Sequence, residues 1–134
     1  MRVWIYEAVI VRHVDGDTTV MDIDQGMNVW SQNQYVRYAG INAPEKHGPT
    51  ATEGVQATEY LESLDGMTPG DGVWLATVEY HESDKYGRVL AVVYTAAPTQ
   101  LNLADGGLAG MMPGSINQEM LDSGHAVEYN PSNL

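Results

Sequence analysis

The sequence contains no cysteine, which excludes disulfide bonds and thiolate metal sites and leaves the redox compartment open. No apolar run approaches the roughly 20 residues that a membrane-spanning helix needs. Neither a serine or cysteine nucleophile arrangement nor a glycine-rich phosphate loop is visible. A zinc site is also disfavoured, because the four histidines show no closely paired spacing: His13, His47, His81 and His125.

The N-terminal segment alternates like a strand and lacks both the apolar stretch and the small-residue cleavage site of a signal peptide. We therefore expect a cytoplasmic protein, although a secreted protein that has lost its leader would have the same sequence. With 134 residues, 43% of them hydrophobic, the chain is long enough for one domain with a core. We expect residues 1–134 to form that single domain.

Positive charge is scarce, since 6 lysines and arginines face 18 acidic residues and give a net charge of -12. Proteins that bind nucleic acid are usually basic, because phosphate contacts supply most of their affinity. Composition alone therefore argues against a nucleic-acid role. A small-molecule or metal site, a basic partner, and adaptation to high salt all remain open.

The order of elements predicts an α+β fold. Five segments have the alternating or β-branched character of strands: 3–14, 18–23, 29–39, 73–80 and 88–94. A helix is expected between the third and fourth strands, and a short helix follows the fifth. This is the order of a five-stranded OB-type β-barrel. Residues 96–114 are rich in Gly, Ala, Pro and Met without clear periodicity, and we expect a long loop there.

Capping residues indicate where the two helices begin. Thr50 or Thr52 can cap the first helix, which would run to about Leu64. Ser115 can cap the second helix, which Gly124 would end. The face expected to pack against the barrel in the first helix consists of Val55, Tyr60, Leu61 and Leu64.

Two stretches offer oxygen ligands. In Asp15-Gly16-Asp17, glycine permits a tight turn beside two short carboxylates, although an ordinary hairpin turn has the same sequence. Arg37 lies in an apolar strand, where a guanidinium needs a partner. Asn42, the Ala43 carbonyl and Glu45 follow it as three oxygen sources, although a surface loop after a strand-edge arginine is an equally good interpretation.

Two more stretches stand out towards the C-terminus. Lys85, Tyr86 and Arg88 concentrate positive charge in one turn, as a phosphate-binding site would, although a solvated hairpin turn would look the same. The segment from Asn117 to Tyr129 combines a short helix with Gly-His-Ala, and we interpret it mainly as packing.

Taken together and in this order, the stretches resemble the staphylococcal (micrococcal) nuclease family. The resemblance covers roughly residues 5–129 outside the long loop. Its most specific feature is the motif DKYGR at 84–88, which follows the arginine, asparagine, proline and glutamate of residues 37–45. The motifs are DGDT at 15–18, RYAGINAPE at 37–45, HGP before the first helix, DKYGRVLA at 84–91 and NQEMLDSGHA at 117–126.

The resemblance implies the same barrel and a calcium-dependent nuclease that cleaves phosphodiester bonds in DNA, RNA or both. In this family two arginines grip the phosphate and a glutamate orients or deprotonates the attacking water. By motif position the implied catalytic residues are Arg37, Glu45 and Arg88, the calcium ligands are Asp17, Asn42 and the Ala43 carbonyl, and the substrate contacts are Lys85, Tyr86 and Tyr129.

The sequence departs from the family pattern at three points. Asn42 stands where the family usually has a second carboxylate, so we expect a weaker metal site that keeps its oxygen ligand. The acidic surface opposes a polyanionic substrate, an effect that high salt would screen. Residues 96–114 replace a short hairpin connection and are expected to form a lid or partner surface. That loop or a second subunit of a homo-oligomer would cover exposed barrel surface.

Two functions compete with a nuclease. A non-catalytic binding module would hold nucleic acid or a protein partner without cutting it, and the acidity and the amide at Asn42 favour this alternative. An acidic decoy would instead bind a basic partner through carboxylates on one face. Arg37, Glu45 and Arg88 are all present and favour the enzyme.

Overall fold

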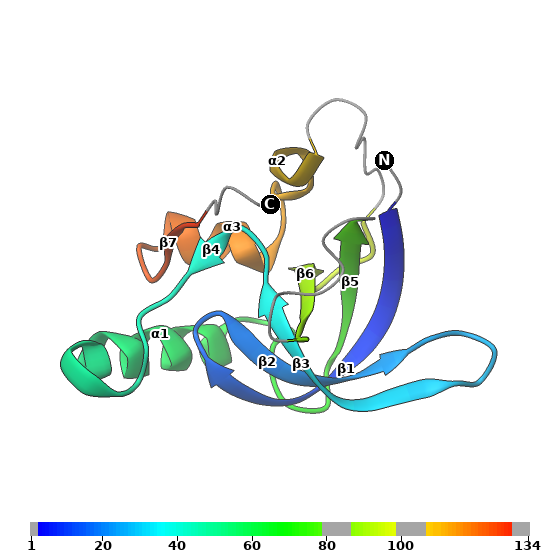
Figure 1. Ribbon diagram of the computed structural model, residues 1–134, viewed down its shortest axis with the longest axis horizontal. Coiled ribbons are helices and arrows are strands. Elements are labelled where there is room, and N and C mark those ends of the chain that lie inside the picture. Colours follow the sequence, from blue (N-terminus) through cyan, green and yellow to red (C-terminus); the bar gives the residue numbers. More distant parts are fainter. Residues whose placement is uncertain (1–2, 79–86, 99–106, 130–134) are drawn as a thin grey trace.

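A computed structural model describes residues 3–78, 87–98 and 107–129 of the chain. Five strands close into a barrel in the order β1-β2-β3-β6-β5, with helices on its outside (Figure 1). Neighbouring strands are antiparallel except β3 and β6, which are parallel. The predicted five-stranded α+β fold of the OB type is confirmed. The strands are β1 (Val3–Asp15), β2 (Thr18–Asp24), β3 (Trp30–Tyr38), β5 (Gly72–Val78) and β6 (Val89–Tyr94).

Helix α1 (Ala51–Ser63) follows the 3-10 turn η1 (Gly48–Thr50) and lies between β3 and β5 in the sequence. It packs against the barrel. Thr50 precedes the helix, but its hydroxyl donates to the Glu45 carbonyl and does not cap the helix. The prediction that Val55 faces the barrel was wrong, since its side chain is 42% exposed. The buried residues of α1 are Gly54, Ala57, Thr58 and Leu61. The small residues among them were overlooked because their side chains are only weakly hydrophobic.

Helix α3 (Ile116–Asp122) begins as predicted, with the Ser115 side chain accepting a hydrogen bond from the Gln118 amide. Its Asn117 side chain is fully buried. The amide nitrogen donates to the carbonyls of Ala39 and Ala91 at 2.8 and 3.2 Å. Its Oδ1 accepts from the backbone of Val93 at 2.9 Å. Asn117 therefore fastens the helix to the end of the parallel β3–β6 pair.

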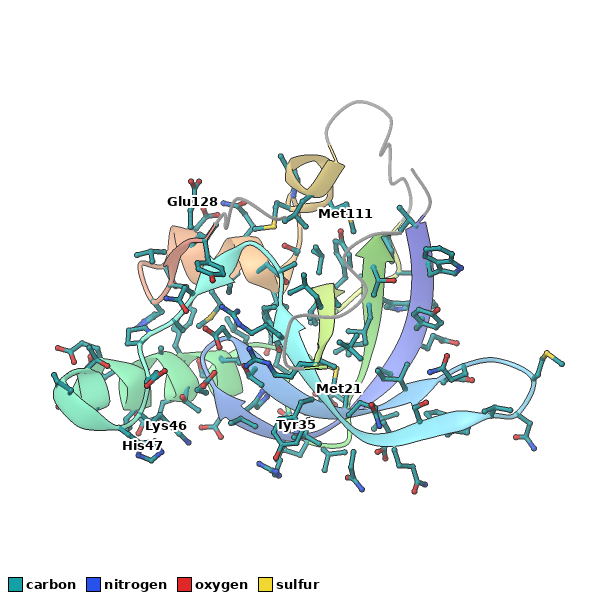
Figure 2. The ribbon with its side chains drawn as sticks, viewed as in Figure 1. Met21, Tyr35, Lys46, His47, Met111 and Glu128 are labelled. Carbon is teal, nitrogen blue, oxygen red and sulfur yellow. The ribbon has the colours of Figure 1, made fainter. Side chains whose placement is uncertain are left out.

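Part of the expected loop at 96–114 is helical. Gly107–Met111 form the short helix α2, whereas residues 99–106 lie outside the described part of the chain. Met111 and Met112 are buried in the core, and the Tyr94 hydroxyl donates to the Met111 carbonyl. A five-residue helix rich in glycine has too few positions to show a periodicity, so the sequence did not reveal it. Figure 2 shows Met111 on this helix, where it helps to cover the barrel.

Two-residue strands form a second sheet beside the barrel. β4 (Ile41–Asn42) pairs antiparallel with β7 (Val127–Glu128), and the Tyr129 amide donates to the Gly40 carbonyl at 2.9 Å. This pairing brings the C-terminal part of the described chain to the segment that follows β3. Among the described residues, no helix is long and apolar enough to span a membrane.

A directed chain of hydrogen bonds crosses the barrel interior. The Met67 carbonyl can only accept, so the His13 Nε2, 2.6 Å away, donates to it. In a neutral imidazole Nδ1 then accepts from the Thr19 hydroxyl at 2.8 Å, which leaves the Thr19 oxygen to accept from the Tyr38 hydroxyl at 2.9 Å. Burial raises the pKa of Tyr38 above its ordinary range, so its hydroxyl stays protonated and is able to donate to Thr19. All four groups are therefore satisfied by one arrangement of protons.

We expect Thr19→Val to lower the free energy of unfolding by about 1–3 kcal/mol, because it leaves a buried acceptor and a buried donor without partners. Urea unfolding followed by tryptophan fluorescence measures this change. Thr58→Val is the matched control, since its hydroxyl shares the Gly54 carbonyl with the helix ladder. Equal losses in the two variants would contradict the role of the His13 chain.

Candidate active site

The turn between β1 and β2 holds a buried carboxylate at Asp17, a residue that is 6% exposed. Its Oδ2 accepts from the Ala43 amide at 2.8 Å, and its Oδ1 accepts from the Thr18 hydroxyl at 3.0 Å. Arg37 Nη1 lies 3.4 Å from the same Oδ2 and forms an ion pair with it. One carboxylate thus joins the turn, strand β3 and the segment after β4.

Arg37 is 8% exposed and is contacted from several sides. Nη1 donates to the Tyr38 carbonyl at 2.9 Å, and Nη2 donates to Asn42 Oδ1 at 3.4 Å. The guanidinium carbon lies 5.8 Å from the centre of the Tyr129 ring. The structure therefore brings together five of the residues predicted from the sequence: Asp17, Arg37, Asn42, Ala43 and Tyr129.

The other predicted residues are placed less fully. Glu45 is exposed, three residues beyond β4. Arg88 immediately precedes β6, and the first residue of that strand, Val89, pairs with Val36 on β3. Arg88 therefore lies at the end of β6 that is beside β3. Lys85 and Tyr86 lie outside the described residues.

Close backbone packing positions the segment that carries Glu45, and sequence analysis missed it. A Cβ added at Gly54 would lie 2.2 Å from the Glu45 carbonyl oxygen and 2.7 Å from the Lys46 amide nitrogen. The same carbonyl accepts from the Thr50 hydroxyl at 3.1 Å. Helix α1 therefore holds this segment by direct backbone contact, which only glycine permits. A glycine inside a helix was the available signal.

Gly16 plays a similar part in the acidic turn. A Cβ there would lie 2.9 Å from the Cβ atoms of both Ala43 and Ala57. Real Cβ atoms do not approach so closely, so a larger residue would push the turn away from α1 and from the backbone next to Asn42. The small residues set the spacing between the acidic turn and its neighbours.

Two carboxylates lie close together in this turn, and Arg37 on β3 forms an ion pair with one of them, Asp17. Burial raises the pKa of Asp15 to about 7, and the hydrogen bond and the charge of Asp17 add to the rise, while Arg37 opposes it. A cation between these groups would relieve the crowding of negative charge. Carboxylate, amide and carbonyl oxygens are ligands that calcium accepts. The donor set of Asp15, Asp17, Asn42 and Ala43 therefore fits a hard cation.

No group of three or more histidine, aspartate or glutamate side chains in the described ranges could hold a metal. A cation at the acidic turn would thus depend on neutral oxygens from Asn42 or Ala43 in addition to the carboxylates.

Comparison with known proteins gives the chain a family. The model of the staphylococcal nuclease homologue family matches residues 35–133. The chain belongs to this family. An Escherichia coli protein named "Uncharacterized endonuclease" is 32% identical over 126 residues, which cover 92% of this chain and 61% of that protein. The chain thus spans about three fifths of this relative's length.

We expect Gly54→Ala to lower the free energy of unfolding by about 1–3 kcal/mol, because the added methyl group overlaps the Glu45 backbone. The sign is informative, since alanine in place of a helical glycine normally stabilises by about 1 kcal/mol. Urea unfolding gives the stability, and amide chemical shifts report displacement of residues 43–47.

Gly72→Ala is the control, because the nearest atom to its added Cβ, the Ala8 carbonyl oxygen, is 3.9 Å away. A stabilised Gly54→Ala protein with unmoved amide shifts would contradict the packing role.

Proposed function

We infer that this protein is a calcium-dependent nuclease that hydrolyses phosphodiester bonds of DNA, RNA or both by attack of water. The observation that carries this inference is the Arg37 guanidinium, which is held among Asp17, Asn42 and Tyr129 on three separate segments. Membership of the family supports it, as does the relative whose name includes endonuclease.

The residues supply the roles that phosphodiester hydrolysis requires. Negative charge grows on the phosphate as water attacks, and guanidinium groups fixed beforehand stabilise that charge without reorganising. Arg37 is fixed in this way, and Arg88 would approach from the start of β6. Glu45 is exposed and would accept a proton from the attacking water. Lys85, Tyr86 and Tyr129 would contact the substrate.

Calcium would be held by Asp17, Asn42 and the Ala43 carbonyl, with Asp15 beside them. When bound, the cation supplies further stabilisation of charge on the phosphate oxygens. The Ala43 amide fixes the orientation of the Asp17 carboxylate by a 2.8 Å hydrogen bond. The protein's own part is therefore to hold these oxygens close together before the substrate arrives.

A non-catalytic binding module is the second candidate. The net charge of -12 favours it, because an acidic surface attracts a polyanionic substrate less. The neutral amide at Asn42 favours it as well, because an amide binds a metal ion less strongly than a carboxylate does. Such a module would have no need of a carboxylate at Glu45. The two candidates thus differ in what Glu45 does.

Cleavage of labelled single-stranded DNA and RNA tests the inference, with calcium or with chelator, at low and at high salt. We expect calcium-dependent cleavage by the wild-type protein. Glu45→Gln should lower kcat about 100-fold, because it removes the proton acceptor and keeps the size of the side chain.

Glu62→Gln makes the same chemical change on the exposed side of α1 and should retain full activity. If wild-type protein binds the strand but does not cut it in millimolar calcium, the binding-module function replaces the nuclease.

We further expect Asn42→Asp to lower the calcium Kd about tenfold, because it adds a negative charge and keeps an oxygen at the same position. Isothermal titration calorimetry with calcium chloride measures this directly and needs no activity. Asn28→Asp adds the same charge at the β2–β3 turn and controls for net charge. Equal affinities in wild type and Asn42→Asp would show that this side chain does not reach the cation.

A further inference from the structure

An exposed arginine and an exposed tyrosine lie across strand β2 from each other. Arg12 Nη2 donates to the Tyr35 hydroxyl at 3.0 Å, and its guanidinium carbon lies 5.7 Å from the Tyr35 ring centre. Val20 pairs with Arg12 on one side and with Tyr35 on the other. Val20 is only 2% exposed although it shares their face, so the two long side chains cover it.

This pair lies on the same outer face as the candidate active site. Val36 and Tyr38 are fully buried inside the barrel, so the alternating Tyr35 and Arg37 both point outward from β3. Figure 2 shows Tyr35 at the outside of these strands. Two residues along a strand span about 7 Å, which makes the row of Tyr35 the immediate neighbour of the row of Arg37.

The row of paired residues across the strands that contains Arg37 also contains the acidic turn. Thr18 pairs with Asp15 on one side and with Arg37 on the other. A strand of nucleic acid whose phosphate rests on Arg37 would therefore meet the Arg12–Tyr35 pair when it continues along the face of β3.

Arg12 forms no ion pair with the other described residues. This is notable because acidic residues outnumber basic ones by 18 to 6. Among residues 3–78, 87–98 and 107–129, Arg37 forms an ion pair with Asp17, whereas Arg12 has the aromatic ring of Tyr35 as its partner. A guanidinium beside an aromatic ring keeps donors for a phosphate. Tyr35 is 44% exposed and offers ring surface to a base or sugar.

We propose that Arg12 and Tyr35 form a second nucleotide subsite, in which Arg12 contacts a neighbouring phosphate and Tyr35 packs on the attached sugar or base. The proposal rests on the nucleic-acid substrate of the proposed function. The subsite holds one nucleotide, because Asp22 occupies the following row, where Val9 is its partner. Its carboxylate accepts from the Asn33 amide at 2.8 Å and would repel a further phosphate.

Binding of fluorescein-labelled oligothymidylates of two and eight nucleotides tests the subsite. The measurements use the Glu45→Gln protein in calcium, so that cleavage does not interfere, and fluorescence anisotropy at several salt concentrations. Arg12→Gln should raise the Kd of the octamer about tenfold and reduce the slope of log K against log salt by about 0.7, since one phosphate contact to a single strand is lost.

The other variants separate charge from stacking. Arg12→Lys should restore the salt slope, because it keeps the charge. Tyr35→Leu should raise the octamer Kd about tenfold and leave the slope unchanged, because stacking carries no charge. Both losses should be smaller on the dinucleotide, which is too short to span Arg37 and Arg12. Trp30→Leu, an exposed aromatic on β3 beyond Asp22, is the control and should bind like its parent.

The outcomes distinguish the subsite from the nuclease. If wild-type protein never cuts but the octamer shows the expected dependence on Arg12 and Tyr35, the nuclease fails and the subsite stands. If wild-type protein cuts while the Arg12 and Tyr35 variants bind the octamer like their parent, the subsite is overturned and the nuclease stands. Equal losses in Trp30→Leu and Tyr35→Leu, or no binding of the octamer by the parent, would also overturn the subsite.

Discussion

The buried contact between Asp17 and Arg37 is the constraint on which the rest of the site depends. Removing two charges from water is costly, and the attraction between them repays that cost only when their remaining hydrogen-bonding groups are also satisfied. Asp17 meets this condition through the Ala43 amide and the Thr18 hydroxyl, and Arg37 meets it through the Tyr38 carbonyl. The ion pair therefore requires that the acidic turn, β3 and the segment after β4 meet at one point.

That meeting explains why small residues surround the site. The Ala43 amide reaches Asp17 only if its backbone lies against the turn, and Gly16 leaves the necessary space. Helix α1 closes on both from the outside through Ala57 and Gly54, and the second of these contacts fixes the backbone of Glu45. A helix with larger residues at these positions would bury more apolar surface but would stand further from the barrel. The small residues at this interface therefore keep α1 close to the site, at the expense of buried apolar surface.

The sequence predicts the strands and the cap of α3 well, because these depend on local chemistry, whereas Thr50 does not cap α1. Alternating and β-branched residues marked the five strands, and Ser115, a residue type that favours helix caps, marked the start of α3. What failed depends on contacts between distant segments. Val55 looked like a core residue by its hydrophobicity, but the closeness of α1 to the site puts glycine and alanine on the buried face. The pairing of β4 with β7 covers two residues on each side, too few to leave a pattern.

The site residues divide in the same way. The resemblance to the nuclease family indicated which residues belong together, and the structure gathers Asp17, Arg37 and Asn42. Motifs do not report register, so the relation of Arg12 and Tyr35 to Arg37 became visible only when the pairing through β2 was known. Likewise, the role of Gly54 lies in a distance of 2.2 Å to a backbone oxygen, which no single-residue property encodes.

The amide at position 42 can be understood from its effect on the arginine as well as on the proposed cation. Asn42 Oδ1 accepts from Arg37 Nη2 at 3.4 Å, while Asp17 faces Nη1. A carboxylate at position 42 would place a second negative charge on the same guanidinium and would compete with a phosphate for it. In a chain of net charge -12, with few other cations to attract a polyanion, that competition would weaken substrate binding. In the proposed nuclease, the neutral amide would keep an oxygen for a cation and leave the charge of Arg37 available to a phosphate, so a weaker metal ligand would serve a stronger phosphate contact.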